Sequence, residues 1–210
     1  MKTIIQVLLA IAIVVLGYMC VESINKPVRF KKDRQARVDK VVERLKEIRS
    51  AQVAYKSVHG AYTASFDTLK SFIAHDSLPM VRMEGSLTDS MLAVGMTELM
   101  ALNQGIIKRD TSRISVLDSL FSRKPWMPDS ISYVPFTDKK EFEMGAGVIR
   151  TASGVDVTVF EAKVHNNVFL EGLDRQEVIN INDTQRKLER YPGLKVGSLE
   201  EANNNAGNWE

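Results

Sequence analysis

The side chains best suited to metal binding or catalysis are three histidines and one cysteine, and they are scattered along the chain. His59, His75 and His165 have no histidine or cysteine partner at the spacing that places two ligands on one helix face. Cys20 is the only cysteine, so no internal disulfide can form. The sequence therefore predicts no metal site.

Glycine-rich and serine-containing motifs do not indicate an enzyme either. The stretch GAGVIR, at 145–150, lies in strand-like sequence and not at a strand-to-helix junction, which favours a bend or bulge over a dinucleotide site. The nucleophile elbow G-x-S-x-G does not occur, although a triad can assemble from distant residues. We expect a protein without catalytic residues or cofactors.

Attraction of anions is the one chemistry that the spacing supports. Five cations, here called the basic collar, lie close together: Lys26, Arg29, Lys31, Lys32 and Arg34. Residues 26–59 carry eleven Lys/Arg against four Asp/Glu, whereas the whole chain has a net charge of only +2. Each cation near an anionic bilayer contributes about 1 kcal/mol. Nucleic acid is the competing partner, but stacking aromatics and a known binding motif are missing, so we expect membrane lipid as a partner and no nucleic acid.

The collar follows an apolar run, Ile4–Val21, in which Gln6 is the only strongly polar residue. At ~1.5 Å per residue the run reaches roughly 27 Å, enough for a bilayer core. We predict an uncleaved transmembrane helix. A cleavable signal peptide is the alternative, but no small-residue cleavage site ends the run. Bulky residues precede Cys20, which also fits lipid attachment poorly.

An amphipathic helix is expected after the collar. Pro27 predicts a bend or interruption, with a second helix from about Asp33. Its apolar stripe, at 3-4 spacing, includes Val38, Val41, Leu45, Ile48 and Tyr55. We expect this stripe to pack on the protein's own sheet. A coiled coil is the alternative, but the stripe lasts only about two and a half heptads and places a glutamine in the seam.

The segment IRSAQVAYKSVHGAYTASFDTL, at 48–69, follows the apolar run and the helix, and Gly60 is expected to end that helix in a left-handed conformation. In this order the first 75 or so residues resemble the type IV pilins and type II secretion pseudopilins, whose helix is followed by a Gly-x-Tyr element and a short helix. The matching positions are Arg49, Ala51, Tyr55, Gly60, Tyr62 and Leu69. The family's basic leader and early glutamate have no counterpart in this sequence.

The resemblance implies a membrane-anchored structural or assembly component of a bacterial cell-envelope machine. It also implies other envelope proteins as partners, a homo- or hetero-oligomer, and the bacterial inner membrane as location. The alternative function is a membrane-tethered protein-binding module held at the inner leaflet by its basic collar. The cations after the apolar run favour a cytoplasmic domain, whereas the resemblance favours a periplasmic one.

The predicted fold class is α+β: an N-terminal transmembrane helix continues into an amphipathic helix that packs on a small antiparallel sheet domain. We expect helices at 65–73 and 86–105, a short helix or strand-helix junction at 111–121, and strands at 130–136, 141–149 and 155–164. The predicted domains are an anchor (1–24), the collar and amphipathic helix (25–60), the α+β domain (61–195) and a tail (196–210).

The asparagine-rich tail permits two interpretations. Its composition is typical of a frayed terminus. Trp209, however, could anchor the tail on its own domain or on a partner, because a large aromatic side chain is a favoured contact residue.

Overall fold

The computed structural model describes residues 2–122 and 124–210. The elements run in the order α1 (Lys2–His59), α2 (Phe66–His75), β1 (Ser77–Glu84), α3 (Asp89–Ala93), α4 (Glu98–Asn103), β2 (Lys108–Ser115), α5 (Val116–Phe121), α6 (Met127–Ser130), β3 (Glu143–Arg150), β4 (Asp156–His165), α7 (Asn166–Phe169), α8 (Arg175–Lys187) and β5 (Gly193–Gly197). The chain divides into two compact units. Unit 1 is Met1–Arg49 with Ser132–Glu210, and unit 2 is Ser50–Ile131.

The predicted transmembrane helix is not confirmed. Within 2–122 and 124–210, no helix is both long and apolar enough to cross a bilayer, so this part of the predicted fold class is wrong. The apolar run is not a separate element. It forms the first part of the 58-residue helix α1, in which Lys2 precedes the run and further charged residues follow it from Glu22 through the collar.

Pro27 lies inside α1 and does not interrupt it, so the predicted second helix start near Asp33 is also wrong. A proline in a helix interior removes one backbone hydrogen bond and costs about 3 kcal/mol. Helix formation is cooperative, and long helical segments on both sides of the proline offset this cost. Phe30 lies three residues after Pro27, and its side chain is buried. This burial helps to hold the helix in place just after the proline.

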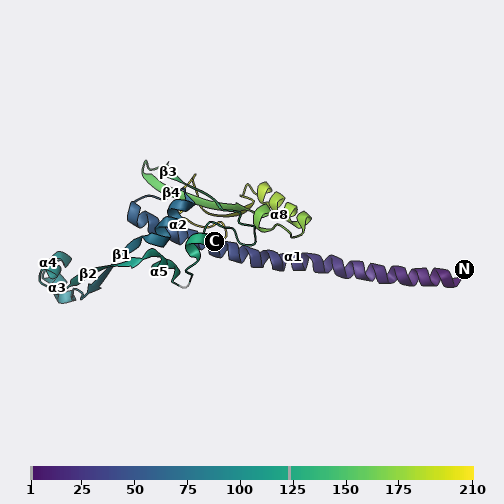
Figure 1. The fold of residues 1–210 in the computed structure, drawn as a ribbon, viewed down its shortest axis with the longest axis horizontal. Helices are drawn as coiled ribbons and strands as arrows, with labels where there is room; N and C mark the ends of the chain where they lie inside the picture. The colour runs from purple at the N-terminus through teal and green to yellow at the C-terminus, as the bar shows by residue number, and fades with distance from the viewer. Residues whose placement is uncertain (1, 123) are drawn as a thin grey trace. The chain divides into compact units, whose positions relative to one another are not determined.

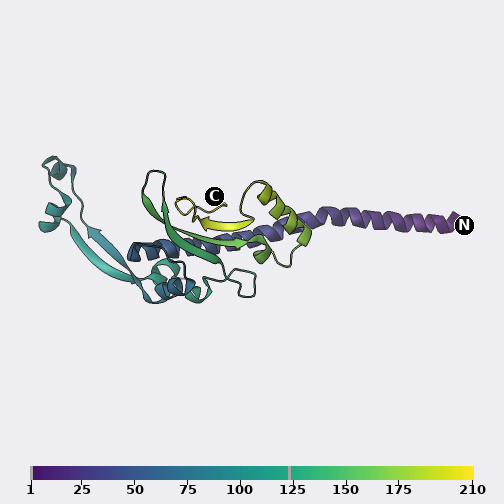
Figure 2. The same ribbon diagram turned by 90° about the horizontal axis from the view of Figure 1, so that it is seen from above.

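Unit 1 contains a three-stranded antiparallel sheet with the order β3-β4-β5. Figures 1 and 2 show this sheet lying along α1. The central strand buries Phe160, Ala162 and Val164 at every second position. In the predicted helix stripe, Val41, Leu45 and Ile48 are fully buried, whereas Val38 and Tyr55 are half-buried.

The expected strand at 130–136 does not form. Only an isolated bridge joins Tyr133 to Glu141. Pro135 has no N–H to donate to a strand ladder, and Phe136 turns the chain with a φ of 64°. The strands expected at 141–149 and 155–164 are confirmed as β3 and β4.

Unit 2 pairs β1 with β2 in a second antiparallel sheet, so the α+β class is confirmed with two small sheets. Helices α3 and α4 lie at one end of the paired strands β1 and β2, and α2 lies near the other end (Figures 1 and 2). The single helix expected at 86–105 is thus two short ones, separated where Gly95 adopts a φ of 77°. The expected strand-helix junction at 111–121 and the helix beginning after Ser65 are confirmed.

A buried amide fixes the turn that follows α1 in unit 2. Gly60 ends the helix with a φ of 79°, as predicted. The side chain of Gln52 is fully buried, accepts a hydrogen bond from the Thr63 backbone N–H at 3.2 Å and donates one to the Thr63 carbonyl at 2.6 Å. The glutamine that looked out of place in an apolar stripe therefore holds the Gly-x-Tyr turn against the helix.

Replacing Gln52 by Leu is expected to destabilise unit 2 by about 1–3 kcal/mol, because the Thr63 N–H and carbonyl would lose these partners in a buried site. Gln35, which is exposed on the same helix, provides the control Gln35→Leu. Urea unfolding followed by circular dichroism measures both variants. Equal midpoints for the two would show that the buried amide contributes nothing.

Candidate functional site

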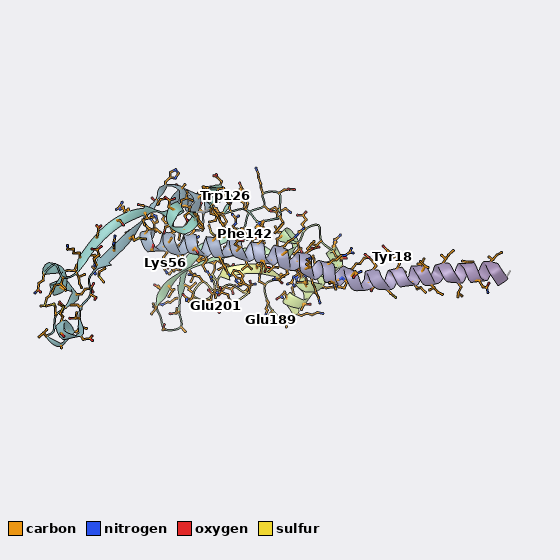
Figure 3. All side chains as sticks on the ribbon, turned by 90° about the horizontal axis from the view of Figure 1, so that it is seen from below. Tyr18, Lys56, Trp126, Phe142, Glu189 and Glu201 are labelled. Carbon is orange, nitrogen blue, oxygen red and sulfur yellow. The ribbon has the colours of Figure 1, made fainter. Side chains whose placement is uncertain are left out.

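The first part of α1 exposes apolar side chains to solvent. We call residues 4–19 the assembly segment. Its exposed large apolar side chains, each 50–72% exposed, are those of Ile4, Leu8, Leu9, Ile11, Ile13, Val14, Val15, Leu16, Tyr18 and Met19. Figure 3 shows the side chain of Tyr18 projecting freely from the helix.

These side chains surround the helix and do not form one face. Ile13, Val14, Val15 and Leu16 are consecutive and all exposed. Because an α-helix has 3.6 residues per turn, four consecutive residues cover its full circumference. A helix that is apolar on all sides is normally buried among other helices or in lipid. The assembly segment is therefore a surface that needs cover on more than one side.

The basic collar divides into two parts. Lys26, Arg29, Lys31 and Lys32 are exposed on α1, as a surface that attracts anions requires. Arg34 is half-buried instead and lines a pocket within unit 1.

This pocket has a volume of about 550 Å³ and is formed by four parts of unit 1: α1, α8 with the turn after it, β5, and the last residues of the tail. We call it the tail pocket. Residues from each wall include Arg34, Ile181, Arg190, Leu194, Asn208 and Trp209. Figures 1 and 2 show α8 beside α1, and Figure 3 places Glu189, another lining residue, just beyond the end of α8.

The tail packs on β5 and is held there at several points. The Asn208 backbone N–H donates to the Lys195 carbonyl, and the Asn208 side chain accepts from the Lys195 N–H and donates to the Gly193 carbonyl. At the end of the tail, Arg49 on α1 donates to a Glu210 carboxylate oxygen at 2.7 Å, which lowers the pKa of Glu210. Trp209, which the sequence offered as an anchor, is half-buried between these contacts.

Two residues that line the tail pocket each have a buried donor without an acceptor. The Nε of Arg34 and the indole nitrogen of Trp209 are buried and make no hydrogen bond to any described residue. An unpaired buried donor typically costs about 1–3 kcal/mol, so native proteins rarely keep one without a bound partner or a water. Sequence analysis missed this arrangement, because Arg34 looked like one more cation of the collar.

The histidines contribute to local structure. His59 stacks on Tyr55 with ring centroids 4.3 Å apart, and His75 contacts the Ser71 carbonyl through Nδ1 at 3.1 Å. His165 caps α7 by accepting the Asn167 N–H, and burial lowers its pKa. No group of three metal-binding side chains lies together among the described residues.

The remaining positions of the family-like segment pack within unit 2. Tyr55 meets Phe72 edge to face at 5.2 Å, and the ammonium group of Lys56 lies 4.7 Å from the centre of the Tyr62 ring. These contacts hold the turn around Gly60 and do not line a pocket described in the structure.

Comparison of the chain with protein-family models, with characterised proteins and with solved structures found no match. The site's own geometry therefore carries the functional interpretation.

Proposed function

We propose that this chain is a pilin-like structural or assembly component of a bacterial cell-envelope machine, in which the assembly segment packs against the same segment of other copies. One observation carries the proposal: Ile13, Val14, Val15 and Leu16 are exposed around the full circumference of α1. A single partner helix covers one face only, so burial of all four by protein requires helices on more than one side.

The magnitudes favour association. Burial of a Val, Leu or Ile side chain contributes about 1.5–3 kcal/mol, so ten side chains that still expose half or more of their surface offer on the order of 10–20 kcal/mol. Association costs about 4–15 kcal/mol in lost freedom. The remainder of each chain would then lie outside a core of assembly segments, which is the arrangement expected of a structural component.

Sedimentation velocity of the full chain without detergent tests this proposal. We expect oligomers for the wild-type chain, and a monomer or a strongly dissociated species for Ile13→Gln/Val15→Gln, which places amides on two sides of the helix. The control is Val148→Gln/Val155→Gln, since both residues are exposed in unit 1, at 65% and 57%, outside α1. A monomeric wild-type chain, or equal dissociation in both double variants, would refute the proposal.

A second candidate function is the binding of an anionic membrane surface by the exposed part of the collar. Lys26, Arg29, Lys31 and Lys32 follow one another on α1, and all four are exposed. Such a cluster attracts anionic head groups through electrostatics that fade beyond about 8 Å at physiological salt.

Neutralising Lys31 and Lys32 to Gln is expected to weaken binding of the full chain to vesicles that contain anionic lipid, by about thirtyfold at low salt, because each of the two cations contributes about 1 kcal/mol there. The control Arg175→Gln/Lys187→Gln removes the same charge from exposed positions of α8. Vesicle co-sedimentation at several salt concentrations measures the effect. Equal binding to neutral and anionic vesicles would leave the collar as a solvated helix surface only.

A further inference from the structure

The tail pocket combines features of a ligand site that neither the assembly segment nor the exposed collar explains. Its volume of about 550 Å³ lies in the range of small-molecule sites. Its walls come from segments far apart in the sequence, α1, α8, β5 and the tail, all within unit 1. The tail's hydrogen bonds to β5 fix the wall that carries Trp209.

The unpaired buried groups on the residues that line the pocket can only donate hydrogen bonds. The Nε of Arg34 and the indole nitrogen of Trp209 are both buried N–H donors, and neither has an acceptor among the described residues. Neither group can accept a hydrogen bond in return. The Arg34 side chain, which lines the pocket, carries donors only, so a ligand that pairs with it must present acceptor oxygens.

The charges in the pocket select an anion among such ligands. Of the lining cations, Arg34 and Arg190 form no ion pair within 2–122 and 124–210, while Lys195 lies 3.6 Å from Glu161. Of the two glutamates that line the pocket, Glu210 is paired at 2.7 Å with Arg49, which is not a lining residue. This leaves two unpaired guanidinium groups against the single carboxylate of Glu189, an excess of positive charge.

An apolar surface accompanies the donors. Val38, Ile181 and Leu194 line the same pocket. Burial and the nearby carboxylates of Glu143 and Glu161 raise the pKa of Tyr191 to about 12, so its hydroxyl stays protonated at neutral pH and adds no negative charge to the wall. The pocket therefore offers cationic donors together with an aliphatic surface.

We propose that the tail pocket binds a small organic anion, whose carboxylate or phosphate oxygens accept hydrogen bonds from the Arg34 guanidinium group and whose short apolar body lies against Val38, Ile181 and Leu194. Arg190 adds charge at the pocket wall. The tail is then one wall of a binding site. Binding here does not depend on association of the assembly segment, so the two proposals fail independently.

Trp209 fluorescence in the full chain tests the inference. The chain has two tryptophans, so Trp126→Phe leaves Trp209 as the only indole, and Trp126 is exposed in unit 2. The probes are butyrate, inorganic phosphate and, as an uncharged control, butanol, each titrated to about 10 mM at constant ionic strength, a range that includes the millimolar affinities of fragment-sized ligands.

We expect a saturable change in Trp209 emission with butyrate or phosphate, and the probe that gives it identifies the anionic group. Arg34→Gln and Arg190→Gln should each weaken this binding about tenfold, in line with loss of a charge-assisted contact. Arg29→Gln, an exposed collar residue of the same helix, should leave it unchanged. Arg190 is exposed, so its variant tests the charge requirement even if Arg34→Gln disturbs folding.

Three results would overturn the inference. The first is no saturable change with either anion. The second is an equal response to butanol and butyrate, which would show an apolar cavity without anion selectivity. The third is wild-type affinity in the Arg190→Gln variant, together with an affinity for the anion that Arg34→Gln leaves unchanged or lowers no more than Arg29→Gln does.

Discussion

Replacing Leu45 by Asp is expected to unfold unit 1 or to destabilise it by more than about 5 kcal/mol. Leu45 is 0% exposed and lies between Val41 and Ile48 on the buried stripe of α1. Loss of a buried leucine side chain alone costs about 2–5 kcal/mol, and the carboxylate would enter an apolar site without a cationic partner. Since whole domains are stable by only about 5–15 kcal/mol, the folded fraction should fall sharply.

Urea unfolding followed by circular dichroism measures this effect. Val53→Asp is the control on the same helix, because Val53 is 47% exposed and a surface substitution typically changes stability by about 0.5 kcal/mol or less. Leu45→Ala should lie between the two and keeps the effect measurable if Leu45→Asp does not fold. Equal unfolding midpoints for Leu45→Asp and Val53→Asp would show that the stripe is not part of the core.

Replacing Gly197 by Ala is expected to cost more than about 3 kcal/mol, because strain and a backbone clash add together. Gly197 ends β5 with a φ of 72°, and a Cβ atom there would lie 2.1 Å from the Phe160 carbonyl oxygen of β4. A backbone carbonyl within a paired strand cannot move aside as a flexible side chain can. The two strands would have to separate, and the tail that pairs with β5 would move with them.

Gly154→Ala separates these two contributions within the same unit. Gly154 has a φ of 80°, but nothing lies within 4 Å of a Cβ atom at that position. We expect this variant to be destabilised only by the cost of the left-handed conformation, about 1–2 kcal/mol. Thermal or urea unfolding compares the two variants, and a Gly197→Ala variant as stable as Gly154→Ala would contradict the close approach of β4 and β5.

Local sequence patterns predicted several parts of the fold, each for a physical reason. The 3-4 spacing of Val41, Leu45 and Ile48 marked a buried helix face, and that face is buried. Gly60 marked a helix end because a left-handed residue is favoured there, and its φ is 79°. The alternation in β4 likewise marked a strand.

Other elements were missed because their signals are weak in isolation. Helix α8 has the sequence RQEVININDTQRK, in which only Val178 and Asn182 are buried, so its apolar face is too narrow to stand out. Strand β1 contains Pro79, and proline is rare within strands because it has no N–H for the ladder. Strand β5 is five residues long with a glycine at each end, and it is held by β4 and by the tail.

The candidate sites differ in how far the sequence could reveal them. The apolar run and the exposed cations of the collar are contiguous, so composition alone located them, although the predicted membrane-spanning helix was wrong. The tail pocket joins Arg34, Arg190 and Trp209 across most of the chain length. Only tertiary structure brings these three together, and no local pattern distinguishes Arg34 from the other cations of the collar.

Dipolar spectroscopy at Cys20 tests the central proposal, association through the assembly segment, most directly. Cys20 is the only cysteine and is exposed next to Met19 on α1, so a nitroxide label attaches there without other substitutions. We predict a defined short distance between labels of different copies in the absence of detergent. We also predict that this signal is lost in Ile13→Gln/Val15→Gln, and that a label moved from α1 to strand β3 by Cys20→Ser/Val148→Cys gives no such distance. Isolated Cys20 labels, or the same signal at both positions, would contradict assembly through this segment of α1.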